Sequence, residues 1–217
     1  MKKILIGVYI LVTVGIIIII SNSSLLTKKD HKAIEAGERI YQQQCFACHG
    51  DNGKGSGAKE GTAINNQHFL NTYSDKDLYN QVKYGREGTV MPAYGSNLSE
   101  EDLNNVVAFM RNWQKKSIEL EAPAKISGDP ENGKKHYELF CATCHGIDGA
   151  GKKKMGTVLI SPQKLQYTTD QQMWISTAYG REDTRMAASL EGADGIRQLS
   201  EQEISDIISY IRTLPSK

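Results

Sequence analysis

The sequence predicts an all-α protein in which one N-terminal transmembrane helix is followed by two similar helical domains. Three observations support this prediction. A run of 17 uncharged, mostly apolar residues extends from Ile4 to Ile20. The remaining chain divides into two matching halves, and each half contains the motif Cys-x-x-Cys-His. After the apolar run, no segment shows the alternation of β-branched residues that is typical of strands.

The apolar run has nearly the length that a membrane span needs. As a helix, "ILIGVYILVTVGIIIII" is ~25 Å long, and the hydrocarbon core of a bilayer is ~30 Å thick. Lys2 and Lys3 precede it, which favours a cytoplasmic N-terminus. The following "SNSSLLTKK" offers no Ala-x-Ala cleavage site. We therefore expect an uncleaved anchor rather than a cleaved signal peptide, with the rest of the chain exported.

Charge excludes one large class of partner. The sequence has 26 Lys and Arg against 25 Asp and Glu, which gives a net charge of +1. Proteins that bind nucleic acid usually carry a strongly basic face. We therefore expect no nucleic-acid partner.

The repeat extends well beyond the cysteine motifs. Gly37 and Tyr41 precede "CFACHG" at the same spacing as Gly133 and Tyr137 precede "CATCHG". Each half then predicts a helix that begins at "SDKD" or "TDQQ", with the spacing of a capping box, and runs into Tyr-Gly-Arg-Glu. "LSEEDLNNVVAFMRNW" and "LSEQEISDIISYIRTL" predict the last helix of each half. The proline-containing stretch between the halves predicts a linker.

The duplicated motif has three chemical explanations. Disulfides are common in exported proteins, and two Cys-x-x-Cys pairs can bind one zinc ion. Neither requires a histidine directly after each pair. Covalent haem attachment does, because two thiols bind the vinyl groups while the histidine lies beneath the iron. We therefore predict two covalently attached haem c groups, held by Cys45, Cys48 and His49 and by Cys141, Cys144 and His145.

Each iron then needs a sixth ligand. Met91 and Met186 lie 42 and 41 residues beyond the two motif histidines, and each follows Tyr-Gly-Arg-Glu. We predict that these two methionines bind iron. The other methionines match core or loop positions, namely Met110, Met155 and Met173. His68, which the repeat alignment pairs with Lys164, is a weaker candidate.

Each half resembles a class I cytochrome c domain, on the motif, the glycine and tyrosine before it, and the methionine loop. The resemblance implies that the first and last helices of a domain cross, with Phe109 and Tyr210 at the crossing. It also implies that a proline carbonyl accepts a hydrogen bond from the ligand histidine. Pro162 fits that position, whereas the first half has Asn66. The expected organisation is an anchor and juxtamembrane segment at 1–30, cytochrome c domains at 31–116 and 128–217, and a linker at 117–127.

With both axial positions filled, the sequence indicates an electron carrier rather than an enzyme. The expected location is the cell membrane, with one span and the haem domains on the periplasmic side. The expected partners are the bilayer and redox proteins such as a quinol-oxidising complex and a terminal oxidase or reductase. Two alternatives stay open: a haem enzyme of the dihaem peroxidase or thiosulfate-oxidising type, and a fixed cytochrome subunit of an oxidase or reductase complex.

Overall fold

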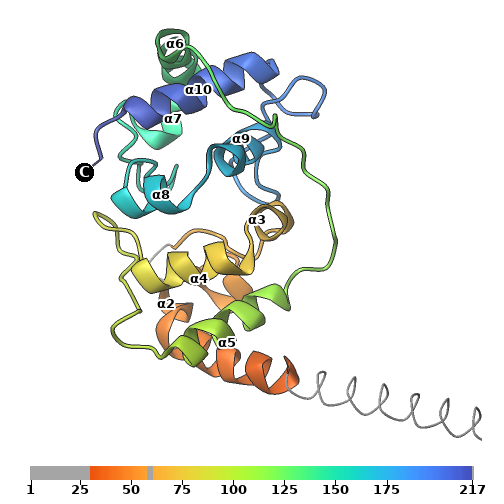
Figure 1. The fold of residues 1–217 in the computed structure, drawn as a ribbon, viewed down its shortest axis with the longest axis vertical. Helices are drawn as coiled ribbons and strands as arrows, with labels where there is room; N and C mark the ends of the chain where they lie inside the picture. Colours follow the sequence, from red (N-terminus) through yellow and green to blue (C-terminus); the bar gives the residue numbers. More distant parts are fainter. Residues whose placement is uncertain (1–29, 58–60, 217) are drawn as a thin grey trace, which may run out of the picture.

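The computed structural model describes residues 30–57 and 61–216, and within them it is helical (Figure 1). The first domain contains a helix over residues 30–44, followed by α2 (Phe46–His49), the 3₁₀ turn η1 (Asp51–Gly53), α3 (Gln67–Thr72), α4 (Asp75–Tyr84) and α5 (Glu100–Arg111). The second contains α6 (Pro130–Phe140), α7 (Ala142–His145), α8 (Pro162–Tyr167), α9 (Asp170–Ala178) and α10 (Glu201–Thr213). In the described ranges, β pairing is limited to two isolated bridges, which confirms the all-α prediction.

The predicted anchor, Ile4 to Ile20, lies outside the described residues. Among the helices of the described part of the chain, none has the length and apolar character that crossing a bilayer requires.

The helix starts that position the sites follow the predicted capping chemistry. The Ser74 side chain accepts a hydrogen bond from the backbone N–H of Asp77, and the Asp77 side chain accepts one from the backbone N–H of Ser74. Thr169 and Gln172 form the equivalent capping box at α9. Both last helices also begin at a Ser capping box. These reciprocal bonds satisfy donors that a helix start otherwise leaves unpaired.

The first and last helices of each domain cross closely at a glycine. A Cβ atom built on Gly37 would overlap the backbone carbonyl of Asn105 in α5, and one built on Gly133 would overlap that of Asp206 in α10. Aromatic rings pack beside both crossings: the ring centroids of Tyr41 and Phe109 lie 5.4 Å apart, and those of Tyr137 and Tyr210 lie 5.3 Å apart. The crossing that the resemblance implied is therefore confirmed.

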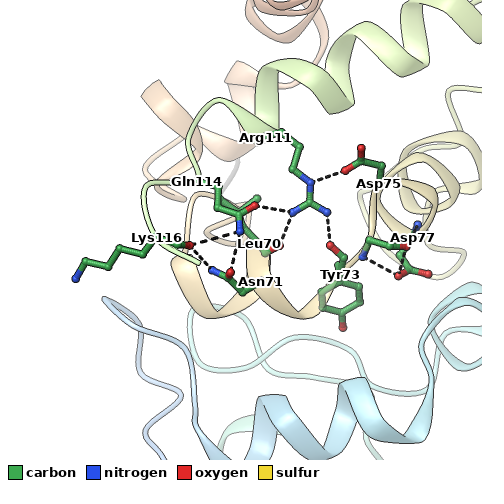
Figure 2. A network of polar contacts seen from close by, with 9 residues as sticks. Leu70, Asn71, Tyr73, Asp75, Asp77, Arg111, Gln114 and Lys116 are labelled. Carbon is green, nitrogen blue, oxygen red and sulfur yellow. Dashed lines mark hydrogen bonds and ion pairs between the residues drawn. The ribbon is translucent and has the colours of Figure 1, made fainter. Parts of the chain in front are cut away.

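An arginine near the end of each last helix joins that helix to two others (Figure 2). Arg111 donates to the backbone carbonyls of Leu70 and Tyr73, and through Nε to Asp75 Oδ1 at 2.5 Å. Arg212 repeats the pattern in the second domain with Leu165, Thr168 and Asp170. Sequence reasoning missed this pair, although both arginines occupy the same place in "FMRNW" and "YIRTL".

Arg111→Leu is expected to destabilise the first domain by about 2–3 kcal/mol. The substitution leaves two carbonyls without their charged donor, and hydrogen bonds to charged groups contribute about 1.5–3 kcal/mol. Asp75→Asn is the matched control, because the Asp75 side chain is 74% exposed and an exposed ion pair contributes at most about 1 kcal/mol. Chemical denaturation of both variants measures the difference. Equal losses in the two variants would show that the carbonyl contacts of Arg111 do not contribute.

The two domains pack against each other through equivalent helices. Figure 1 shows α8 beside α4, and α3 packs on α9. Tyr84 and Tyr167 stack between the domains with ring centroids 4.8 Å apart. The stretch before α6 also packs on the second domain, since Tyr179 donates to the carbonyl of Glu121 at 3.1 Å.

The structure corrects one detail of the repeat alignment. Asn66 caps α3 and Ser161 caps α8, so these two residues are equivalent. His68 therefore corresponds to Gln163, not to Lys164. The residue equivalent to Lys164 is Phe69, a buried aromatic residue. The sequence pairing was shifted by one residue because the loops before these helices differ in length.

Candidate functional site

Each Cys-x-x-Cys-His motif forms a single helical turn. Cys45 caps α2, and its carbonyl accepts hydrogen bonds from the backbone of Cys48 at 3.1 Å and of His49 at 2.9 Å. The second motif repeats this turn with the same two distances in α7. The four cysteines are unbridged and partly buried. Burial raises the pKa of the Cys45 and Cys141 thiols to about 11, so before haem attachment both are protonated at neutral pH.

The structure orients each motif histidine through a backbone carbonyl. His49 Nδ1 lies 2.8 Å from Thr62 O, and His145 Nδ1 lies 2.8 Å from Thr157 O. A carbonyl only accepts, so Nδ1 carries the proton and the Nε2 lone pair is left for a metal. Burial is the main cause that lowers the pKa of both histidines, which favours the neutral, ligating form.

The expectation that Pro162 supplies this carbonyl is wrong. Pro162 is the first residue of α8, where its fixed φ suits the helix start. Thr157 takes the carbonyl role instead, five residues earlier in the loop. Sequence reasoning missed it, yet a signal was present: Gly-Thr recurs at 61–62 and 156–157 after the two motifs.

A buried tyrosine fixes the end of each motif. Tyr41 and Tyr137 are fully buried and donate to the carbonyls of Gly50 and Gly146, both at 2.7 Å. Burial raises the pKa of both phenols, so they remain donors. These bonds link the first helix of each domain to its haem motif and explain why tyrosine recurs at this position.

Met91 and Met186 lie in loops with the same hydrogen bonds. The Met91 carbonyl accepts from the backbone of Arg86 at 2.9 Å, and its N–H donates to Thr89 Oγ1 at 3.1 Å. In the second loop, Met186 makes the same two bonds, with Arg181 at 2.7 Å and with Thr184 at 3.1 Å. Equivalent loops therefore present the two predicted ligands.

Further contacts place these loops beside the haem motifs. Tyr94, three residues after Met91, donates to the carbonyl of Gln44 at 2.8 Å. Arg86 lies near enough to His49 to add to the lowering of its pKa, and Arg181 acts in the same way on His145. Met110 and Met173 are buried core residues, as expected. His68 points to the carbonyl of Gly180 in the other domain, 3.4 Å away.

The residues at both sites fit haem c. Each site combines two free thiols, a histidine with one nitrogen left for iron, and a partly buried methionine in a hydrogen-bonded loop. The zinc alternative finds no support, because the described residues contain no group of three or more His, Cys, Asp and Glu side chains able to hold a metal ion.

Fold and sites together define the class of protein: a c-type cytochrome with two class I domains. Comparison with known families agrees with this assignment. Residues 32–110 match the family model described as cytochrome c oxidase, cbb3-type, subunit III, and residues 130–215 match the model described as cytochrome c. The chain is a dihaem class I c-type cytochrome, with one covalent haem c in each domain.

Curated relatives include subunits of one kind of oxidase. The chain is 28% identical over 189 residues to the cbb3-type cytochrome c oxidase subunit FixP of Azorhizobium caulinodans, covering 82% of this chain and 58% of that protein. It is 27% identical over 135 residues to the subunit CcoP of Rubrivivax gelatinosus, covering 59% of this chain and 39% of that protein. The chain thus spans about two fifths to three fifths of the length of these relatives.

A solved structure shares the fold. The reducing HAO-like protein complex of Kuenenia stuttgartiensis contains a chain that superimposes with a TM-score of 0.53 at 21% identity. The match covers 83% of this chain and 96% of that one. At this identity, the likeness describes the fold alone.

Proposed function

We propose that this protein transfers electrons through its two haems and catalyses no reaction of its own. One observation carries the proposal: each domain presents a histidine with its Nε2 free and a methionine in an equivalent, hydrogen-bonded loop. Histidine and methionine together would fill both axial positions of an iron. A substrate would then have no open position at the metal, which favours electron transfer over small-molecule chemistry.

The bound haem would supply a one-electron Fe(III)/Fe(II) couple. The protein residues would set its properties. The Nδ1 bonds of His49 and His145 to Thr62 and Thr157 hold each imidazole in one tautomer and one orientation. The thioethers of Met91 and Met186 are soft, neutral ligands, and such ligands favour Fe(II) and raise the reduction potential relative to a second histidine.

Carbon monoxide separates a carrier from a haem enzyme. The fully reduced holoprotein should bind no carbon monoxide at neutral pH, because both irons have two protein ligands. Spectra recorded before and after addition of the gas test this directly. Binding at either haem would reveal an open or easily displaced ligand and would favour the peroxidase-type alternative.

We further propose that the protein is anchored in the cell membrane by residues 4–20, with its haem domains in the periplasm. The apolar run and the lysines before it support this topology. N-terminal sequencing of the mature protein tests the anchor. We expect the native N-terminus, whereas a sequence that starts between residues 21 and 30 would contradict an uncleaved anchor.

The relatives favour a fixed subunit of a respiratory complex over a free electron carrier. FixP of Azorhizobium caulinodans and CcoP of Rubrivivax gelatinosus are named as oxidase subunits. We propose that this chain accepts electrons from a quinol-oxidising complex and passes them to a terminal oxidase or reductase. Sizing after mild detergent extraction, with haem detection, should show the haem signal in a large complex. Migration of all the haem at the size of the single chain would contradict a fixed subunit.

A further inference from the structure

At the boundary between the domains, equivalent residues of the two repeats lie in comparable positions. Arg86 and Arg181 occupy the same position in the two copies of Tyr-Gly-Arg-Glu, and Phe69 and Lys164 are each the third residue of a short helix. Arg181 crosses the boundary, and its guanidinium carbon lies 5.1 Å from the centre of the Phe69 ring. This is an ordinary cation–π contact.

The opposite half of the boundary breaks this symmetry. Arg86 and Lys164 line the same narrow crevice between the domains, together with Gln81, Gly85, Gln163, Tyr167 and Thr168. Where Arg181 meets an aromatic ring, Arg86 therefore meets a second cation. Two like charges in one crevice repel each other, most strongly where water is excluded.

Lys164 is buried and the two arginines are partly buried, and among the described residues none of the three has an anionic partner. Lys164 is only 8% exposed. Burial first, and then the charges of Arg86 and Arg181, lower the pKa of Lys164 well below its ordinary value. Within residues 30–57 and 61–216, no carboxylate lies within ion-pair distance of any of the three. This environment disfavours the charged form of Lys164, and an anion bound beside it would restore that charge.

An independent observation points to the same ligand chemistry. Gln81, which also lines the crevice, accepts a hydrogen bond from Arg86 Nη2 at 2.8 Å through its Oε1. Its Nε2 is buried and has no hydrogen-bond partner. Buried polar atoms are rarely left unpaired, so this donor also indicates an acceptor in the crevice.

The two haem motifs lie close to these cations. Arg86 is near enough to influence His49, and Lys164 and Arg181 are near enough to influence His145. Haem carries carboxylate side chains, which suit a cluster of guanidinium and ammonium groups. We propose that Arg86, Lys164 and Arg181 form one carboxylate-binding site shared by the two domains, which holds haem carboxylates from both. This inference rests on the proposed dihaem function.

A shared site makes a distinctive prediction for the reduction potentials. A positive charge stabilises Fe(II) relative to Fe(III), because reduction lowers the positive charge at the iron. Lys164→Gln removes one such charge from between the domains. Both haem potentials should therefore fall, although Lys164 belongs to the second domain alone.

The test is a potentiometric titration of the purified holoprotein, after two haems per chain have been established. Lys135→Gln is the matched control, because it removes the same charge from an exposed site on α6. We expect Lys164→Gln to lower both potentials by more than this control does, and Lys164→Arg to restore them. If Lys164→Gln matures with fewer than two haems per chain, Arg86→Gln is measured instead, with the same expectation.

A downward shift of both potentials would support the shared site. A shift confined to the second haem, or shifts no larger than those of Lys135→Gln, would overturn it. Titrating the wild type with and without inorganic phosphate at constant ionic strength identifies the source of the anion. Covalently held haem carboxylates predict unchanged potentials, whereas a phosphate-dependent shift would show an exchangeable anion and would overturn the assignment. A wild type without attached haem would instead refute the proposed function itself.

Discussion

Replacing Met91 with alanine is expected to lower the reduction potential of one haem and leave the other spectrally unchanged. The variant removes the thioether that we propose as the axial ligand of the first iron, and with it a preference for Fe(II). Met186→Ala should do the same to the second haem. The measurement is the iron–sulfur charge-transfer band of the oxidised protein, followed together with the potential of each haem.

Variants that lack one pair of cysteines assign the band to a single haem. In a protein with both Cys141 and Cys144 replaced by alanine, Met91→Ala should abolish the remaining band. Met110→Leu is the control, since Met110 is buried in the core of the first domain and should leave the band intact. Survival of the band in the Met91 variant would refute the ligand assignment.

The two methionines should differ slightly in how firmly they hold iron. Pro92 follows Met91, and its ring restricts the backbone of both residues. Ala187, which follows Met186, imposes no such restriction. Between its methionine and its last helix, the second domain has six more residues than the first. This longer loop adds little flexibility, because backbone hydrogen bonds close it, from Leu199 to Ser189 at 2.7 Å and from Glu191 to Leu199 at 2.9 Å. The proline alone should stabilise the Met91 loop by about 0.4–1 kcal/mol. Heating should therefore displace Met186 from its iron before Met91, at a slightly lower temperature.

Gly133→Ala is expected to destabilise the second domain. The added Cβ would overlap the carbonyl of Asp206, so α6 and α10 must move apart at the crossing. Overpacking of this kind costs about 1–3 kcal/mol or more, against a gain of about 1 kcal/mol in helix propensity. We therefore expect a net destabilisation of up to about 2 kcal/mol, measured by denaturation of the holoprotein.

Lys135→Ala is the control for that prediction, because Lys135 lies on the exposed side of α6. It should leave the stability within about 0.5 kcal/mol of the wild type. Gly37→Ala should reproduce the loss in the first domain, where the Cβ would overlap Asn105. If Gly133→Ala and Lys135→Ala prove equally stable, the close helix crossing does not limit the stability of the domain.

Most of the fold and both haem motifs could be predicted from local features of the sequence. The capping boxes at Ser74 and Thr169 formed as predicted because their bonds join residues only three apart. The helix crossing was predictable through the resemblance to class I cytochrome c domains, which rests partly on Gly37 and Gly133. The methionine loops share a hydrogen-bond pattern that the repeated Tyr-Gly-Arg-Glu had indicated. Whether Met91 and Met186 bind iron stays a prediction.

Contacts between distant segments escaped sequence reasoning. Thr62 and Thr157 act through backbone carbonyls, which any residue can supply, so their side chains gave no chemical signal. Arg111 joins α3, α4 and α5, and only the tertiary fold brings these together. The meeting of Arg86 with Lys164 depends on how the two domains pack, and the one-residue shift in the repeat alignment concealed the exchange of Phe69 for Lys164.

The intact mass of the denatured mature protein tests the central claim most directly, because only covalently attached haem survives denaturation. Expression in a host with cytochrome c maturation should give the mass of the polypeptide plus two haem groups. Replacing Cys45 and Cys48 by alanine should remove one of them. A wild-type mass equal to the polypeptide alone, or to the polypeptide with a single haem, would contradict the account.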